Sequence, residues 1–573
     1  MAARRSNYPE KRKVKNTPMT IDRRAHAPFR LGVLLSCVYA LLGPFAQAAE
    51  TSAGPNVIFI VADDLGYGDL RCFGNPYVDT PTLDKLARDG VRFTDYYAAS
   101  PLCAPSRAAM LTGRFNHRTG AVDVSSNMGI DRIALSEKTF GDYFRHAGYA
   151  TALVGKWHSG LYSNEYLPHR RGFDLFYGFP NGGHDYWKWS LMRNGRNETA
   201  DGRYMTDVFN DEASAFVEKN RERRFALFLA HHAPHSPLQA PEALVDKYVA
   251  RGKGKFNRSV ATIYAMIEAM DTGIGRLLAT VEACGLREKT IVVFTSDNGA
   301  ILGPSPDIPG ETTDRYHGSF RGNKDTVYEE GIRVPAIVVW PGRIPAGQTI
   351  KTPVHGCDWL PTLFARTGQS APPGAKPFDG ADIFDLMLGK ADGALETRAL
   401  PFQKNRYTPV PYSDAAIRRG PWKLFWPIVA ETCKKDNGRD SPSYLRGVVN
   451  PHWEMPLDPD VPTYPTVRSV TPQLFNLLED PGESTDLSLQ HPELVKELAA
   501  RYDAWFTEVF AEWQGANREI REHDALYWKS RPVPDARELF REFWRWKGSG
   551  ADPQKDDPLK VFRGYWSYPR ERS

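Results

Sequence analysis

Cysteine is scarce in this sequence of 573 residues, and neither sign of charge dominates. The six cysteines show no spacing typical of a zinc site. The 73 Lys and Arg residues nearly match the 69 Asp and Glu residues, so the net charge of +4 does not indicate a nucleic-acid partner. Beyond the N-terminal region, no apolar run is long enough to cross a membrane. We therefore expect a mature chain with no transmembrane segment and no nucleic-acid partner.

The N-terminus is typical of an export signal. Basic residues up to Arg24 precede the apolar run Leu31–Phe45, and small residues at Ala46 and Ala48 complete a cleavage site. The fifteen residues of this run are too few for a comfortable membrane span. We expect cleavage near Ala48 and export to the periplasm or the medium, by the Sec or the twin-arginine route. The chain that remains after cleavage has an odd number of cysteines, which indicates that at least one thiol is not paired in a disulfide within the chain.

Alternating strands and helices predict a large α/β sheet domain. Continuous apolar runs are typical of strands that are buried on both faces. The predicted strands of this domain are Asn56–Ala62, Val91–Tyr97, Tyr149–Val154, Phe225–Ala230, Thr290–Thr295 and Ile332–Trp340. The predicted helices are Pro81–Gly90, Thr139–Gly148, Val260–Cys284, Asp358–Thr367 and, further along the chain, Pro492–Glu508.

The sequence pattern changes near Pro401. A hairpin predicted at 415–426 then indicates a smaller α+β unit built on an antiparallel sheet. The predicted organisation is a signal peptide at 1–48, an α/β catalytic domain at 49–400, an α+β subdomain at 401–515 that contains a long insertion at 427–472, and a basic, aromatic extension at 516–573.

Polar side chains follow four of the predicted strands, where each strand ends. In open α/β sheets, ligands bind beyond the carboxyl ends of the strands, so these groups are expected to meet. The residues are Asp63, Asp64, Lys156, His158, His235, Asp297 and Asn298. Three carboxylates and an amide oxygen suit a hard cation, and such a carboxylate-rich set favours calcium over magnesium. Arg107, Lys156 and Lys324 are suited to hold a tetrahedral anion such as sulfate or phosphate. The histidines are candidate proton carriers.

Cys103 begins a predicted short helix that passes through Pro105 and ends at Gly113. Taken alone, such a cysteine is more often a small buried side chain than a catalyst. The whole pattern, Cys103-Ala104-Pro105-Ser106-Arg107 followed by Leu111-Thr112-Gly113-Arg114, resembles the signature of type I sulfatases, and the resemblance extends from about Asn56 to Leu487. It implies that a formylglycine-generating enzyme oxidises Cys103 to formylglycine. It also implies an alkaline phosphatase-like fold, with a large central mixed β-sheet flanked by helices.

The resemblance implies a role for each matching residue. The implied metal ligands are Asp63, Asp64, Asp297, Asn298 and the modified Cys103. Arg107 and Lys156 would steady the formylglycine hydrate, and Lys324 would bind the sulfate. His235 would lie near the leaving-group oxygen, and His158 would be the base of the second half-reaction, in which the sulfated enzyme releases sulfate.

The expected substrate is a sulfated poly- or oligosaccharide. His235-Ser236-Pro237-Leu238-Gln239-Ala240-Pro241 resembles the matching segment of galactosamine-sulfate sulfatases. The candidate substrate contacts are His184, Asp185 and Trp187, close to Gly183, where some members of the family have a serine. One alternative is a phosphonate or phosphate ester hydrolase of the same superfamily, since the cationic groups suit both anions. Another is an inactive exported carbohydrate-binding protein.

Overall fold

The computed structural model describes most of the chain after residue 53. The described residues are 54–124, 131–161, 163–404, 409–427, 434–436, 439–441 and 471–529. The predicted signal segment, most of the predicted insertion at 427–472 and the chain after residue 529 lie outside them. Within the described residues, no helix has the length and apolar character needed to cross a membrane.

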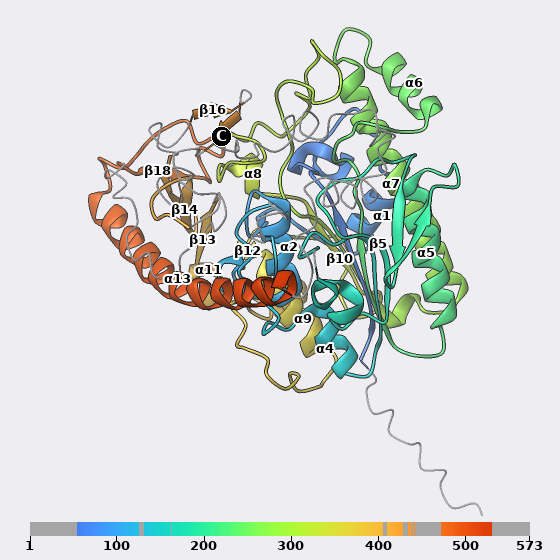
Figure 1. The fold of residues 1–573 in the computed structure, drawn as a ribbon. Helices are drawn as coiled ribbons and strands as arrows, with labels where there is room; N and C mark the ends of the chain where they lie inside the picture. Colours follow the sequence, from blue (N-terminus) through green and yellow to red (C-terminus); the bar gives the residue numbers. More distant parts are fainter. Residues whose placement is uncertain are drawn as a thin grey trace, which may run out of the picture. The chain divides into compact units, whose positions relative to one another are not determined.

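Ten strands in the described part of the chain form the central sheet (Figure 1). They lie in the order β11-β2-β10-β9-β1-β8-β4-β5-β6-β7. β1 is parallel to β8 and β9, whereas β10 is antiparallel to β9, so the prediction of a large mixed sheet is confirmed. The strands are β1 (Asn56–Ala62), β2 (Val91–Phe93), β4 (Ala150–Lys156), β5 (Leu175–Phe179), β6 (Ser190–Arg193), β7 (Arg196–Thr199), β8 (Phe225–Ala230), β9 (Thr290–Ser296), β10 (Ala336–Val339) and β11 (Gln348–Ile350).

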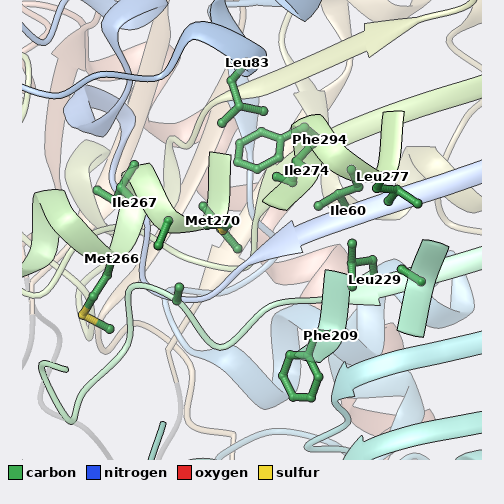
Figure 2. Packing of buried hydrophobic residues seen from close by; sticks show 14 of the residues in the cluster. Ile60, Leu83, Phe209, Leu229, Met266, Ile267, Met270, Ile274, Leu277 and Phe294 are labelled. Atoms are coloured by element: carbon green, nitrogen blue, oxygen red, sulfur yellow. The ribbon is translucent and has the colours of Figure 1, made fainter. Parts of the chain in front are cut away.

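Helices cover both faces of this sheet. On one face lie α1 (Pro81–Asp89), α5 (Met205–Lys219), α6 (Glu242–Arg251) and α7 (Arg258–Ala283); on the other lie α2 (Cys103–Thr112), α4 (Phe140–His146) and α9 (Trp359–Ala365). Ile60 of β1 belongs to the first apolar cluster and Phe59 to the second, so successive side chains of one strand are buried in opposite layers. In Figure 2, Ile274 and Leu277 of α7 lie next to Ile60. This two-sided burial explains the unbroken apolar runs.

A smaller antiparallel sheet follows, in the order β13-β14-β15-β18, as the hairpin predicted. Its strands are β13 (Ala399–Gln403), β14 (Ala415–Arg419), β15 (Trp422–Trp426) and β18 (Gln473–Asn476). The last described helix, α13 (Pro492–Lys529), packs against this sheet and against α3 (Asn116–Thr119). The remaining described elements include β3 (Tyr96–Tyr97), β12 (Val354–His355), β16 (Lys434–Asp436), β17 (Arg439–Ser441), α8 (Glu329–Ile332), α10 (Phe384–Met387) and α11 (Gly393–Thr397).

Three predicted elements differ from the structure by more than two residues at one end. The strand predicted at Val91–Tyr97 is divided, because β2 joins the central sheet while β3 pairs with β12. The strand predicted from Ile332 begins only at Ala336, since Ile332 ends α8 and Pro335 cannot donate to a ladder. The helix predicted to end at Glu508 continues to Lys529. Its later turns bury Trp513, Ala516 and Ile520.

Candidate active site

The carboxyl ends of β1, β4, β8 and β9 bring the predicted polar residues together. Lys156 Nζ lies 2.7 Å from Asp63 Oδ2. Arg107 Nε donates to Asp297 Oδ2 over 2.8 Å, and the Asp64 N–H donates to Asp297 Oδ1 over 3.2 Å. All five of these residues are buried. Lys324 reaches the same cluster from the segment before α8 and pairs with Asp64 Oδ1.

The turn after β1 is held by an ion pair that sequence reasoning missed. Asp64 has a φ of +63°, in the left-handed region that is costly for a residue with a side chain. Arg315 forms a two-bond pair with Asp69, with both distances 2.7 Å, and also donates to the Asp64 carbonyl. Asp69 in turn accepts from the Gly66 N–H. Arg315 lies 246 residues from Asp69 in the chain, so no local pattern could have indicated this contact.

Three buried oxygens at this edge accept no hydrogen bond from any described residue: Asp63 Oδ1, Asp64 Oδ2 and Asn298 Oδ1. The amide nitrogen of Asn298 donates to Asp64 Oδ1 over 2.7 Å, which leaves its oxygen free. Carboxylate oxygens of Asp63, Asp64 and Asp297 also lie within 4.8 Å of one another. Buried oxygens without donors are costly unless a cation occupies the space between them. The donor set therefore fits a hard divalent cation.

The pKa values of Asp63 and Asp64 also favour a bound cation. Burial raises the pKa of Asp297 well above its ordinary range, despite the adjacent Arg107. Burial acts in the same direction on Asp63, but Lys156 and other neighbouring groups outweigh it and hold the Asp63 pKa well below the usual value. For Asp64, burial is outweighed by Lys324, and the pKa is lowered. Asp63 and Asp64 thus stay ionised in a dry environment, where a bound cation would stabilise their negative charge.

Cys103 is the first residue of α2, and Gly113 ends the helix at a φ of +67°, as predicted. The Cys103 Sγ lies 3.2 Å from His158 Nδ1, and both residues are buried. The other ring nitrogen of His158, Nε2, lies 3.1 Å from the Val124 carbonyl, so Nε2 carries the proton and Nδ1 presents a lone pair to residue 103. Burial lowers the pKa of His158 to about 3, which keeps the ring neutral. His158 is therefore placed as a base toward residue 103.

His235 and Lys324 both approach the carboxylate of Asp64, His235 at Oδ2 and Lys324 at Oδ1. The Nδ1 of His235 is 2.6 Å from the Ser236 carbonyl, and its Nε2 is 3.7 Å from Asp64 Oδ2. Burial lowers the His235 pKa to about 3. Burial would also lower the Lys324 pKa, but Asp64 and other nearby acids outweigh it and raise that pKa. At this end of the site a permanent ammonium thus stands beside a neutral imidazole.

The three predicted substrate contacts have different environments. His184 is buried, and its Nε2 lies 3.0 Å from the Ser190 carbonyl. Asp185 accepts from the backbone N–H groups of Trp187 and Lys188 and from Gln239. Trp187 is 37% exposed and packs against Tyr204. Of the three, only the Trp187 side chain has a large exposed surface. A Cβ on Gly183 would lie 3.8 Å from His235 Cε1, so this loop lies directly beside His235.

Comparison with known proteins defines the class. The Sulfatase family profile matches residues 55–369. The chain is 30% identical to N-acetylgalactosamine-6-sulfatase of Canis lupus familiaris, over 78% of this chain and 84% of that protein. It is 30% identical to steryl-sulfatase of Mus musculus, over 91% of each. Among solved structures, Ps i-CgsB in complex with k-i-k-neocarrahexaose superimposes with a TM-score of 0.64 at 26% identity, over 85% of this chain and 100% of that one.

The chain therefore belongs to the sulfatase family of the alkaline phosphatase-like superfamily. It is a sulfatase, an enzyme that hydrolyses sulfuric esters (EC 3.1.6). Members of this family typically use a metal ion, in agreement with the acidic cluster at the sheet edge.

Proposed function

We propose that this sulfatase removes sulfate from a sulfated carbohydrate, with a bound calcium ion and with formylglycine formed from Cys103. The observation that carries the proposal is the position of Cys103, whose Sγ faces the lone pair of His158 at the edge that holds the acidic cluster. The residues that would hold calcium are Asp63, Asp64, Asp297 and Asn298, together with residue 103. Calcium supplies positive charge against sulfate and nucleophile oxygens, and a formylglycine hydrate supplies two hydroxyl groups at position 103.

The chain's own groups move the protons and bind the anion. His158 Nδ1 accepts a proton from a hydroxyl at position 103, while Val124 holds the opposite side of the ring. Arg107 keeps one buried nitrogen, Nη2, with no hydrogen-bond acceptor among the residues described, so it can donate to an anionic oxygen. Together with Lys156 and Lys324, it balances the charge of a bound sulfate ester.

His235 and Lys324 deliver the proton to the leaving alcohol. The neutral His235 ring lacks a proton on Nε2. A sulfate anion bound beside it raises its pKa again, since a negative neighbour favours the imidazolium ion. The Lys324 ammonium group already carries a proton and donates to the same region. The pair can thus protonate the departing oxygen.

The carbohydrate assignment is supported by two observations. The exposed Trp187 ring offers an aromatic surface on the loop that passes His235. Among the similar proteins, one is named for the 6-sulfate of N-acetylgalactosamine, and one solved structure contains a neocarrahexaose. The similarity to steryl-sulfatase makes a steroid sulfate the natural competing substrate for the test.

The test uses protein produced together with a formylglycine-generating enzyme. Mass spectrometry of the Cys103 peptide should show conversion of the thiol to the aldehyde. Turnover is then compared on sulfated sugars, a steroid sulfate and a phosphate ester matched to one of the sugars, with Cys103→Ala as the inactive control. We expect the highest kcat/KM on a sulfated sugar. Faster hydrolysis of the steroid sulfate or of the phosphate ester would refute the carbohydrate assignment.

We also propose that the protein is exported after cleavage near Ala48. The basic N-terminus, the short apolar run and the small residues Ala46 and Ala48 support this proposal. N-terminal sequencing of protein from the periplasm or the medium should begin at or near Ala49, and an intact Met1 end on all recovered protein would contradict it.

A further inference from the structure

His232 follows β8 and has no role in the proposed chemistry above. Its side chain is fully buried, and both ring nitrogens have partners. Nδ1 lies 3.0 Å from Asp63 Oδ2. Nε2 lies 3.2 Å from both the N–H and the carbonyl oxygen of His184. The hydrogen-bond partners of the two nitrogens therefore determine which of them is protonated.

Asp63 Oδ2 also lies 2.7 Å from the Lys156 ammonium group, which can only donate, so this oxygen acts as an acceptor. The proton between it and His232 must therefore be on Nδ1. A neutral ring then accepts at Nε2 from the His184 N–H, and a protonated ring donates there to the His184 carbonyl. In both states Nδ1–H donates to Asp63 Oδ2. The contact is thus independent of the charge on His232.

This hydrogen bond completes the set of partners around one Asp63 oxygen. Oδ2 receives Lys156 Nζ at 2.7 Å and His232 Nδ1 at 3.0 Å. Oδ1 of the same carboxylate is buried and accepts no hydrogen bond within the described part of the chain; the Arg107 Nη2 lies 3.8 Å away. Two donors on Oδ2 restrict rotation of the carboxylate and aim Oδ1 into the acidic cluster.

Aromatic packing fixes the ring itself. The Tyr186 ring is nearly parallel to that of His232, at 16° and a centroid distance of 5.0 Å. Phe179 meets it edge-on at 5.2 Å. The His235 ring stacks on it at 4.8 Å and 29°. The same imidazole therefore contacts a carboxylate of the acidic cluster and the histidine on the leaving-group side.

We propose that His232 is a positioning residue, which holds Asp63 so that Oδ1 is free to ligate the cation and which supports the ring of His235. This inference rests on the proposed cation site. Outer hydrogen bonds to metal-binding carboxylates commonly change metal affinity by about 10- to 100-fold. The competing assignment is a second metal site, because ligand atoms of Asp63, His232 and His235 lie within 4.8 Å of one another. An ion there would have to displace the Lys156 ammonium group from Asp63 Oδ2, which argues against it.

Side-chain amides separate the functions of the two ring nitrogens. The amide nitrogen of His232→Asn lies near the position of Nδ1 and can still donate to Asp63, whereas that of His232→Gln lies near Nε2 and cannot. His231→Gln is the matched control, because His231 is equally buried and neither of its ring nitrogens has a hydrogen-bond partner among the described residues. Calcium affinity is measured by calorimetry on protein stripped of metal, together with kcat, KM and formylglycine content.

We expect His232→Gln to bind calcium about 10- to 100-fold more weakly than wild type, whereas His232→Asn and His231→Gln stay within a few-fold. Unchanged calcium affinity in His232→Gln would overturn the proposal, as would equal losses in folded His232→Asn and His232→Gln. Two zinc ions bound per wild-type chain and one per His232→Gln chain would establish the second metal site instead. Failure of the wild type to bind calcium refutes the proposed cation site itself, which separates the two conclusions.

Discussion

Lys423 provides a direct test of how the smaller sheet is joined to the catalytic unit. It lies on β15, its side chain is fully buried, and Nζ is 3.0 Å from Glu329 Oε1 and 2.8 Å from Glu483 Oε1. Glu329 belongs to α8, which leads into β10 of the central sheet. Lys423→Met keeps most of the side-chain volume and removes the charge. The substitution therefore leaves two buried carboxyl groups without their shared cation.

The expected loss of stability depends on the partners that Glu329 and Glu483 keep when Lys423 is replaced. Glu329 keeps Tyr97 at 2.6 Å and Arg333 at 3.3 Å, so it stays paired. Burial has already raised the pKa of Glu483 to about 7, and without Lys423 this acid becomes protonated in the folded state. Breaking a buried ion pair costs about 3–5 kcal/mol, and protonation of Glu483 brings the loss toward about 3 kcal/mol near neutral pH. The loss grows as the pH rises, because an ionised Glu483 is then favoured only in the unfolded chain.

The free energy of unfolding is measured by urea denaturation of wild type and Lys423→Met at several pH values. Lys423→Met with Glu483→Gln is the control, because it removes the acid left without a partner and should recover part of the loss. If the free energy of unfolding of Lys423→Met lies within about 0.5 kcal/mol of the wild-type value at alkaline pH, the reasoning is refuted, because an ordinary surface substitution has an effect of that size.

Three further predictions concern the cation, acid stability and α13. Chelation should lower the melting temperature, because Asp63 and Asp64 then repel each other, and calcium should restore it; an unchanged melting temperature would contradict a bound cation. Burial lowers the pKa of His117 and His355 to about 4. As the pH drops from about 6.5 toward 4, these histidines therefore take up protons in the unfolded chain before they do so in the folded protein. The free energy of unfolding then falls by up to about 3 kcal/mol for each histidine. His117→Gln should reduce this slope in urea denaturation, and an unaltered slope counts against its origin in His117. Arg118→Met should speed limited proteolysis within α13, because the buried guanidinium pairs with two glutamates of that helix; equal cleavage rates would show that apolar packing alone holds it.

Much of the catalytic edge could be predicted from local patterns. The apolar run of β1 followed by Asp63 and Asp64 gave the strand and the place of the acids, because a strand buried on both faces has no polar residue until it leaves the sheet. The start of α2 at Cys103 followed from Pro105 and Gly113. These signals are short-range and need no knowledge of the partners.

Other features had no local signal. His184 stays a predicted substrate contact, and no local pattern indicated that its buried ring lies against the Ser190 carbonyl or that its backbone contacts the ring of His232. Arg315, Val124 and His232 were missed, although they hold the Asp64 turn, the His158 ring and the Asp63 carboxylate. Each acts on a residue between 34 and 251 positions away in the chain.

The sequence by itself determined the chemical groups, the strands that carry them and the edge at which they meet, because hydrophobic period and chain breaks are local properties. Only the tertiary structure decided which oxygen of Asp63 is free and which nitrogen of His158 faces residue 103. Those choices depend on hydrogen bonds between distant segments, such as Lys156 with Asp63, and the geometry of such bonds exists only after the sheet and its helices have packed.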